Sequence, residues 1–393
     1  MIDLASCGFY RINGIVYFDK IHAMEVAKKT GQEIEFDFND DFWSLKDWKQ
    51  PSSLSLTELY RLRAEQIRNK HDHIALCLSG GADSVNVLST FDKNNIKLDE
   101  IICWHNHSLS ADWQSIVSGE VVDVAIPMAK EYISRHPDTT LTIIDQLDAF
   151  KETMKLSDEK IMQLMSHSPS PSSLSAFTGS WVCTLDSFKK RIDTGKSFGL
   201  IWGAEKTFIR KIPGLITKYG FSGFNEVGRA ILIKNTLTSY SVTDEFFYWS
   251  IDFSELIITQ CHILKEHLDK IPLTYVDPDI QIIETNKSGR MVSIETKTGI
   301  KIGLRTINLW LYGQEVLSKS SRTGKPNGSL FLSPVDDWMK NAHTTSEGIK
   351  WLSITKQYMQ QFLKVGNVSN TWILNKTFGK TDPSLKSKSY LIE

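Results

Sequence analysis

The stretch "HIALCLSGGADSVNVLSTF", residues 73–91, decides how this chain folds. Six residues that favour a β-strand lead into Ser-Gly-Gly-Ala-Asp-Ser, and a segment with the apolar spacing of a helix follows at once. Backbone N–H groups at a helix N-terminus lack partners inside the helix, and the helix dipole is positive there. Glycines let that backbone approach an anion closely, and serine hydroxyls add donors. The joint between strand and helix therefore predicts a phosphate-binding loop over residues 79–84.

The segments around this loop alternate between strand and helix. Strand-like segments occupy residues 73–79, 99–105, 140–145 and 197–206, and helix-like segments occupy residues 84–95, 122–136 and 182–195. This alternation favours an α/β fold with a doubly wound, mostly parallel sheet. Such sheets bind ligands at the carboxyl ends of their strands, which is where the loop falls.

We predict three regions along the 393 residues. Residues 1–48 form a small N-terminal β/α unit with a hairpin turn at Asn13-Gly14. Residues 49–255 hold the parallel sheet, which is preceded by a long helix that Ser55 caps. Residues 256–393 form a mixed α+β region for contacts with a substrate or partner.

Other segments do not follow the alternation. Residues 146–181 are expected to form an irregular insert, because they contain a stretch rich in Ser and Pro. After Lys211 the sequence becomes aromatic-rich, and a helix follows over about 254–268. A hairpin with its turn at residues 286–289 comes next.

Composition narrows the class of protein. The formal charge is −1 at pH 7, so whole-chain charge gives no case for nucleic-acid binding, and a local basic patch needs separate support. No apolar run approaches the roughly 18 residues of a membrane span, and the first residues lack the pattern of a secretory leader. The five cysteines are scattered without a Cys-x-x-Cys pair, which argues against a disulfide framework and a zinc ribbon. A cytoplasmic protein without membrane partners is expected.

The loop differs from the Walker A type of phosphate loop. That type requires a lysine after its last glycine, which reaches the β and γ phosphates. No lysine follows Gly81. Any cation that assists the chemistry must therefore come from another part of the chain.

Residues 79–84 do resemble the PP-loop signature S-G-G-x-D-S of the N-type ATP pyrophosphatase superfamily, at every fixed position. The superfamily includes the synthetase domain of asparagine synthetase, GMP synthetase and NAD synthetase. The resemblance covers about residues 55–211 and implies an adenine nucleotide alpha hydrolase-like fold. Such enzymes split ATP between its α and β phosphates, adenylate a carbonyl or carboxylate oxygen, and release AMP when a nucleophile attacks.

This resemblance implies a site for ATP and Mg²⁺. The residues expected to bind the pyrophosphate part of ATP are Ser79, Gly80, Gly81, Ala82, Asp83 and Ser84. Asp83 is also the candidate for binding Mg²⁺ and for a catalytic role. Its alternative roles are to cap the helix or to orient the loop.

Further candidates lie at the ends of two other strands. Trp104 and His105 end the second strand of the sheet, where they could stack on or bond to adenine. The alternative is a buried tryptophan and a polar loop. Glu205 and Lys206 end the fourth strand, where charge is useful at the α-phosphate of ATP. Lys206 is the leading candidate for the missing cation.

Four residues are candidates for contacts with the second substrate. Arg210 and Lys211 would add to the positive field or hold a carboxylate. Trp249 would wall the substrate pocket and Asp252 would orient an amine. The alternative for this second pair is the start of a core helix.

Three functions fit these residues. The first is an AMP- and pyrophosphate-forming ligase that adenylates a small molecule or nucleotide for attack by an amine or ammonia. The second is a PP-loop enzyme that modifies a nucleobase or tRNA by sulfur transfer, with Cys103 and Cys183 as candidate sulfur carriers. The third is a non-catalytic protein that binds ATP. The residues favour the first function and leave its second substrate unnamed.

Overall fold

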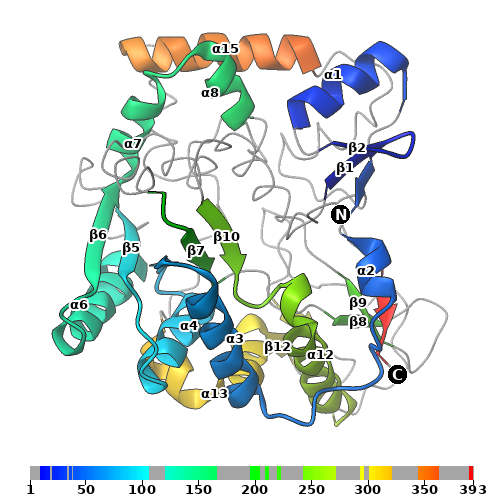
Figure 1. The fold of residues 1–393 in the computed structure, drawn as a ribbon, viewed down its shortest axis with the longest axis vertical. Helices are drawn as coiled ribbons and strands as arrows, with labels where there is room; N and C mark the ends of the chain where they lie inside the picture. The colour runs from blue at the N-terminus through cyan, green and yellow to red at the C-terminus, as the bar shows by residue number, and fades with distance from the viewer. Residues whose placement is uncertain are drawn as a thin grey trace.

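The computed structural model describes residues 9–17, 20–32, 35–37, 39–105, 120–165, 195–203, 209–211, 219–222, 242–270, 293–295, 301–320, 344–362 and 389–392. Its centre is a five-stranded sheet whose strands all run parallel, in the spatial order β10-β7-β4-β5-β6 (Figure 1). In chain order these strands are β4 (His73–Cys77), β5 (Glu100–His105), β6 (Thr140–Asp145), β7 (Phe198–Trp202) and β10 (Val242–Phe246). The prediction of an α/β chain with a parallel sheet is confirmed.

Helices cover the sheet because its strands are apolar on both faces. On one face, Ile74 and Leu76 of β4 belong to a large buried cluster. The helices that contribute to this cluster include α3 (Leu56–Lys70), α4 (Ala82–Lys93), α6 (Ile126–Arg135), α12 (Ser254–Asp269) and α13 (Leu304–Lys319). On the other face, Ala75 and Cys77 belong to a second cluster, to which α7 (Gln146–Thr153) adds Ala149.

The helices around the loop follow the sequence pattern with two differences. The segment predicted as one helix over 122–136 divides into a π-helix, η1 (Glu120–Ala125), and α6. The insert predicted to be irregular begins with two helices, α7 and α8 (Asp158–Met165), so that part of the prediction was wrong. The carboxylate of Asp145 caps α7 by accepting from the N–H groups of Leu147 and Asp148. The helix predicted over 182–195 falls on residues of which only Gly195 is described.

The N-terminal region forms a separate small sheet in the order β2-β1-β3. Its elements are β1 (Phe9–Ile12), β2 (Ile15–Tyr17), α1 (Lys20–Thr30), β3 (Glu35–Asp37) and α2 (Asp40–Ser44). The predicted hairpin turn is confirmed, since Asn13 and Gly14 both have positive φ, 47° and 79°. The predicted cap of α3 is also confirmed, since Ser55 accepts a hydrogen bond from the N–H of Glu58.

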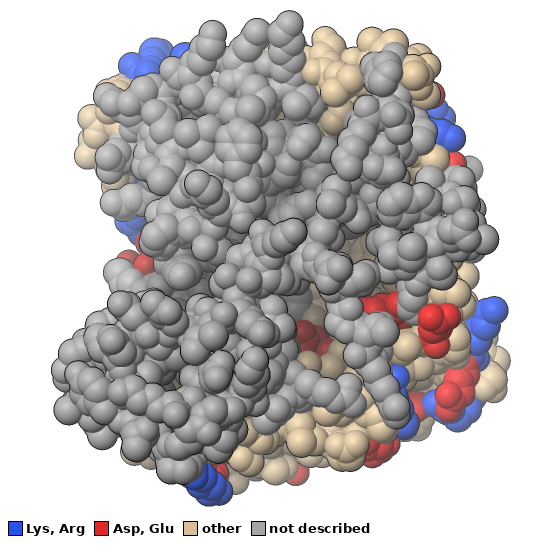
Figure 2. Space-filling view, turned by 180° about the vertical axis from the view of Figure 1, so that it is seen from behind, with Lys and Arg blue, Asp and Glu red and all other residues tan. Residues whose placement is uncertain are grey.

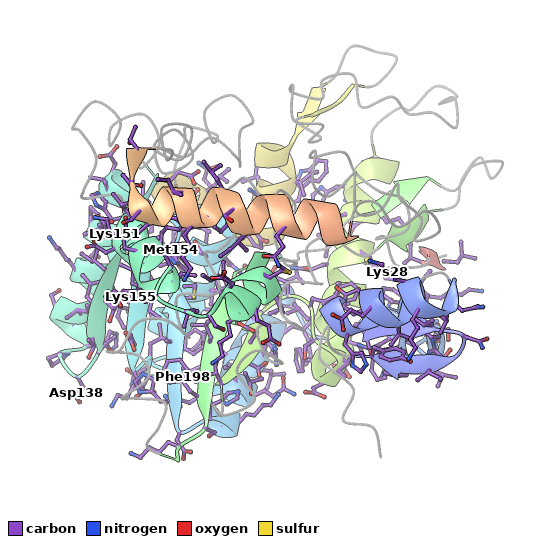
Figure 3. All side chains as sticks on the ribbon, turned by 90° about the horizontal axis from the view of Figure 1, so that it is seen from above. Lys28, Asp138, Lys151, Met154, Lys155 and Phe198 are labelled. Atoms are coloured by element: carbon purple, nitrogen blue, oxygen red, sulfur yellow. The ribbon has the colours of Figure 1, made fainter. Side chains whose placement is uncertain are left out.

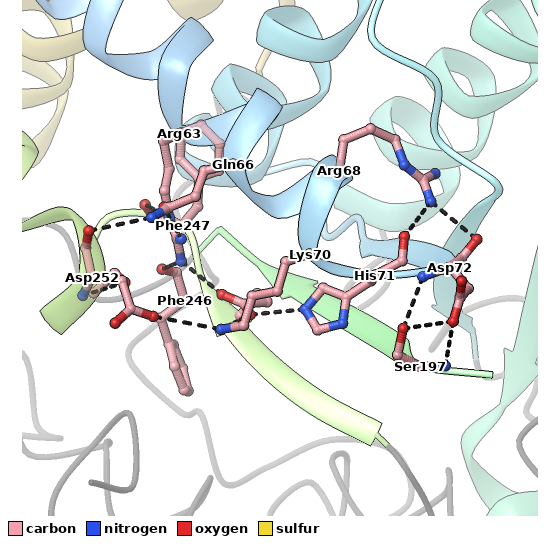
Figure 4. A network of polar contacts seen from close by, with 12 residues as sticks. Arg63, Gln66, Arg68, Lys70, His71, Asp72, Ser197, Phe246, Phe247 and Asp252 are labelled. Carbon is pink, nitrogen blue, oxygen red and sulfur yellow. Dashed lines mark hydrogen bonds and ion pairs between the residues drawn. The ribbon is translucent and has the colours of Figure 1, made fainter. Parts of the chain in front are cut away.

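The edge strand β10 was not predicted, because two consecutive acids stand in its middle. The second of them, Glu245, is buried and pairs with Arg63 at 2.8 Å, His71 at 2.9 Å and Lys70 at 2.8 Å (Figure 4). Burial raises the pKa of Glu245, but its bond to His71 and the charges of Arg63 and Lys70 outweigh that effect, and the pKa falls to about 2. This network fixes α3 to the edge of the sheet.

The C-terminal region packs on both ends of the molecule. Helix α15 (Ser346–Phe362) lies across the turn between α7 and α8, where Met154 is found (Figure 3). There the ammonium of Lys350 donates to the carbonyl oxygens of Met154 and Leu156, both at 2.8 Å. The remaining strands are β8 (Ile209–Lys211), β9 (Tyr219–Ser222), β11 (Ser293–Glu295), β12 (Lys301–Gly303) and β13 (Ser389–Leu391). They form a sheet in the order β13-β9-β8 and an antiparallel pair β11-β12. The turn predicted at 286–289 lies outside the described residues.

The described part of the face in Figure 2 has no extended basic area, because its lysines and arginines lie among acidic residues. Within the described ranges, no helix combines the length and the apolar character that crossing a bilayer requires.

Candidate functional site

The loop at residues 79–84 lies where the order of the parallel sheet reverses. The chain passes from β4 to β5 and β6 on one side, and later returns with β7 and β10 on the other side of β4. At such a switch point the connections diverge and leave room for a ligand at the carboxyl ends of the strands. The loop follows β4 directly, so it occupies this position between the ends of β5 and β7.

Gly80 takes a backbone conformation that other residues rarely adopt. Its φ is +84°, and a Cβ at this position would lie 2.3 Å from the carbonyl oxygen of Glu120 and 3.2 Å from the backbone nitrogen of Ala125. The π-helix η1 therefore rests directly on the loop backbone. Two independent constraints, φ and space, both require glycine at this position.

Hydrogen bonds between the two serines close the loop. Ser79 Oγ lies 3.1 Å from Ser84 Oγ, and the N–H of Ser79 donates to Ser84 Oγ at 3.2 Å. Ser84 Oγ donates to the carbonyl oxygen of Gly81 at 3.1 Å. Gly81 is the N-cap of α4, and no side-chain hydrogen bond caps the helix there. The start of a helix is where backbone N–H groups lack partners within the helix, so this end of α4 lies where an anion would be favoured.

The end of β7 holds the loop from the other side. A Cβ on Gly203 would lie 2.6 Å from Ser84 Cα and 2.7 Å from Ser84 N. The backbone after β7 thus touches the backbone of the loop, as close packing between a strand end and a helix start requires. Ala82, the remaining loop residue, is partly buried and packs against the main core.

Two tryptophans flank β4 at the same edge of the sheet. Trp104 of β5 and Trp202 of β7 stack with ring centroids 5.6 Å apart. The indole N–H of Trp202 donates to Asp244 Oδ1 at 2.6 Å. Burial raises the pKa of the Asp244 carboxyl to about 7, although the bond from Trp202 opposes that rise. His105, by contrast, is buried on the opposite face of β5.

Asp83 is held by tyrosines from distant parts of the chain. The hydroxyl of Tyr312 donates to Asp83 Oδ1 at 2.9 Å, and the hydroxyl of Tyr248 donates to the carbonyl oxygen of Asp83 at 2.8 Å. The Asn86 amide donates to the hydroxyl of Tyr248 at 3.0 Å. Burial raises the pKa of Tyr248 and Tyr312 well above the usual value, with a further contribution from the Asp83 charge, so both hydroxyls remain donors.

The described residues do not include all the predicted site. Glu205 and Lys206 lie outside them, and Arg210 and Lys211 are described only as backbone in β8. Trp249 is buried and packs on Trp43, with centroids 4.8 Å apart. The carboxylate of Asp252 is half exposed and lies 3.5 Å from the ammonium of Lys70.

Cys103 does not have the surroundings of a reactive thiol. Its side chain is fully buried, and burial raises its pKa to about 12. Sulfur carriers need exposed thiols that ionise readily. Cys183 lies outside the described residues.

Sequence reasoning missed Gly203, Tyr248 and Tyr312, which contact the loop, and also Asp244, which bonds to Trp202. Gly203 lies within the segment predicted as a strand over residues 197–206, and a glycine at the end of a parallel strand is a recognisable signal of close approach. Asp244 and the two tyrosines gave no signal, because their partners are far away in the sequence.

Comparisons of the chain with protein-family models and with curated proteins find no match.

Proposed function

We propose that this protein is an ATP-dependent ligase that forms AMP and pyrophosphate. It would adenylate a carboxylate or carbonyl oxygen of a small molecule or nucleotide, for attack by an amine or ammonia. The fold would be of the adenine nucleotide alpha hydrolase-like type. The Ser79–Ser84 signature motivates this proposal, and the position of the loop in the sheet supports it.

The observation that carries the proposal is the position of Gly80 and its loop at the switch point of the sheet. The left-handed φ of Gly80 and the backbone contact at Gly203 bring the loop backbone and the N-terminus of α4 together at this edge. Backbone donors at a helix N-terminus bind phosphate oxygens without needing a lysine. A loop of this kind fits the β and γ phosphates, which leave together as pyrophosphate.

The roles of individual residues follow from their chemistry. The N–H groups and serine hydroxyls of the loop would bind and orient the departing pyrophosphate. Asp83 would bind Mg²⁺, which proteins often hold with one or two carboxylates together with substrate phosphates and water. The described residues hold no group of three or more His, Cys, Asp or Glu side chains placed for a metal, so the phosphates would supply the other ligands. Lys206 would neutralise charge at the α-phosphate.

The stacked pair of Trp104 and Trp202 gives an aromatic surface at the ends of the two strands that flank β4. Aromatic rings of this size favour a planar base through stacking. Trp104 would therefore contact adenine, and Trp202 would keep its orientation through Asp244.

ATP–pyrophosphate exchange tests the proposal. Pools of metabolites are added to the protein with Mg²⁺, ATP and labelled pyrophosphate, and label entering ATP identifies the pool that contains the adenylated compound. Asp83→Asn should abolish the exchange. Asp92→Asn is the matched control, because Asp92 is in the same helix but pairs with Arg135 and His136 outside the loop. Formation of ADP in place of AMP would overturn the proposal.

The two alternatives give different results. A sulfur-transfer enzyme would lose turnover on substitution of Cys103 or Cys183, and the burial of Cys103 argues against the first of these. A non-catalytic protein would bind ATP tightly and form no pyrophosphate with any pool.

A further inference from the structure

A cluster of three buried tyrosines lies behind the candidate anion-binding loop. Tyr60 comes from α3, Tyr248 follows β10 and Tyr312 comes from α13. Their ring centroids are 5.6 to 6.3 Å apart. All three side chains are at least 92% buried, since the exposed fractions are 5%, 0% and 8%.

Only two of the three hydroxyls reach the loop. Tyr312 and Tyr248 bond to the carboxylate and to the carbonyl oxygen of Asp83. Tyr60 instead donates to the carbonyl oxygen of Leu311 at 3.1 Å and accepts from the amide of Gln260 at 3.1 Å. The cluster thus contains an internal comparison between hydroxyls that touch the loop and one that does not.

The backbone of α13 presents Tyr312 to Asp83. The helix is interrupted at Gly313, whose φ of +79° and ψ of 169° are not helical. Tyr312 is the last residue before this interruption. On the outer side, Lys93 of α4 pairs with Glu315 of α13 at 2.6 Å, so α13 is attached to α4 on both sides of the interruption.

An aspartate in the first turn of a helix can turn back and accept from the first-turn N–H groups itself. It would then compete with a phosphate for the same donors. The bond from Tyr312 engages one carboxylate oxygen of Asp83 on the side of α13. A carboxylate held toward α13 in this way would compete less with a phosphate for the donors of the loop.

We propose that Tyr312, supported by Tyr248, is a positioning residue that holds Asp83 so that the loop can bind pyrophosphate. The proposal rests on the proposed function, because it assumes that the loop is an anion site. It also makes the C-terminal region, through α13, a determinant of affinity at a loop 229 residues away from Tyr312.

Binding of inorganic pyrophosphate with Mg²⁺, measured by calorimetry on the full chain, tests this role. Tyr312→Phe should weaken binding about tenfold, because a hydrogen bond to a charged group contributes more than one to a neutral group. Tyr248→Phe should weaken it less, because its partner is a neutral carbonyl. Tyr60→Phe is the matched control: it removes a buried hydroxyl from the same cluster and should leave pyrophosphate affinity unchanged.

A double-mutant comparison separates positioning from general loss of structure. In an Asp83→Ala background, Tyr312→Phe should have no further effect on pyrophosphate affinity, since the carboxylate that it positions is gone. Equal weakening by Tyr60→Phe and Tyr312→Phe would overturn the positioning role, as would an unchanged affinity in Tyr312→Phe. Either result leaves the proposed function intact. Failure of the unmodified protein to bind both pyrophosphate and ATP would overturn the proposed function, and the positioning role with it.

Discussion

Replacing Gly80 by alanine tests the geometry of the loop without any knowledge of the ligand. The added Cβ would lie 2.3 Å from a backbone oxygen of η1, and backbone atoms cannot rotate away as a side chain can. The left-handed φ of +84° costs a non-glycine residue about 1–2 kcal/mol. Overpacking in a tight region adds about 1–3 kcal/mol. The free energy of unfolding should therefore fall by about 2–5 kcal/mol.

Gly195→Ala is the matched control for this substitution. Gly195 has a φ of +74° and precedes β7 of the same sheet, and no atom of the described residues lies within 4 Å of the position of a Cβ. It should show only the conformational cost of about 1–2 kcal/mol. Urea unfolding followed by the fluorescence of the chain's 11 tryptophans measures both variants. If Gly80→Ala is no more destabilising than Gly195→Ala, η1 does not rest on the loop and the described geometry is wrong.

Three further outcomes are expected. As pH falls from about 4.5 to 2, the urea concentration at the midpoint of unfolding should drop, because the folded-state pKa of Glu245 lies below its ordinary value. Glu245→Gln should make this drop smaller. Asp244 acts in the opposite sense: its raised pKa means that stability falls as pH rises from about 4 to 7, and Asp244→Asn should remove that fall in urea unfolding. Cys103→Ala should keep full ATP–pyrophosphate exchange. Loss of exchange at a temperature where the variant stays folded would support the alternative of a sulfur-transfer enzyme.

The sequence predicts the parts of the site that depend on neighbouring residues. The strand, the loop and the start of α4 are continuous in the chain, and their residue types carry the geometry: glycine at the left-handed position and small polar residues at the helix start. Turns such as Asn13-Gly14 and the Ser55 cap were predictable for the same reason, because a few local bonds decide them.

Tertiary partners decide the features that the sequence did not predict. Strand β10 contains Asp244 and Glu245, and acids are rare inside buried strands unless they are paired. Their partners are Trp202 and a network from α3, which no local pattern reveals. Tyr248 and Tyr312 likewise meet Asp83 only after the chain has folded, from 165 and 229 residues away.

The order of the strands also affects how the protein folds. Strands β4, β5 and β6 are close in sequence and can pair early. The other edge of β4 pairs with β7, which begins more than 120 residues after β4, so this pairing is expected later. Pairings between distant segments form slowly because a long loop must close first. Until they form, β4 is an exposed sheet edge that is open to pairing with other chains. A ligand held between the loop and the end of β7 would bridge these two halves, so it would slow their separation as well as stabilise the finished fold.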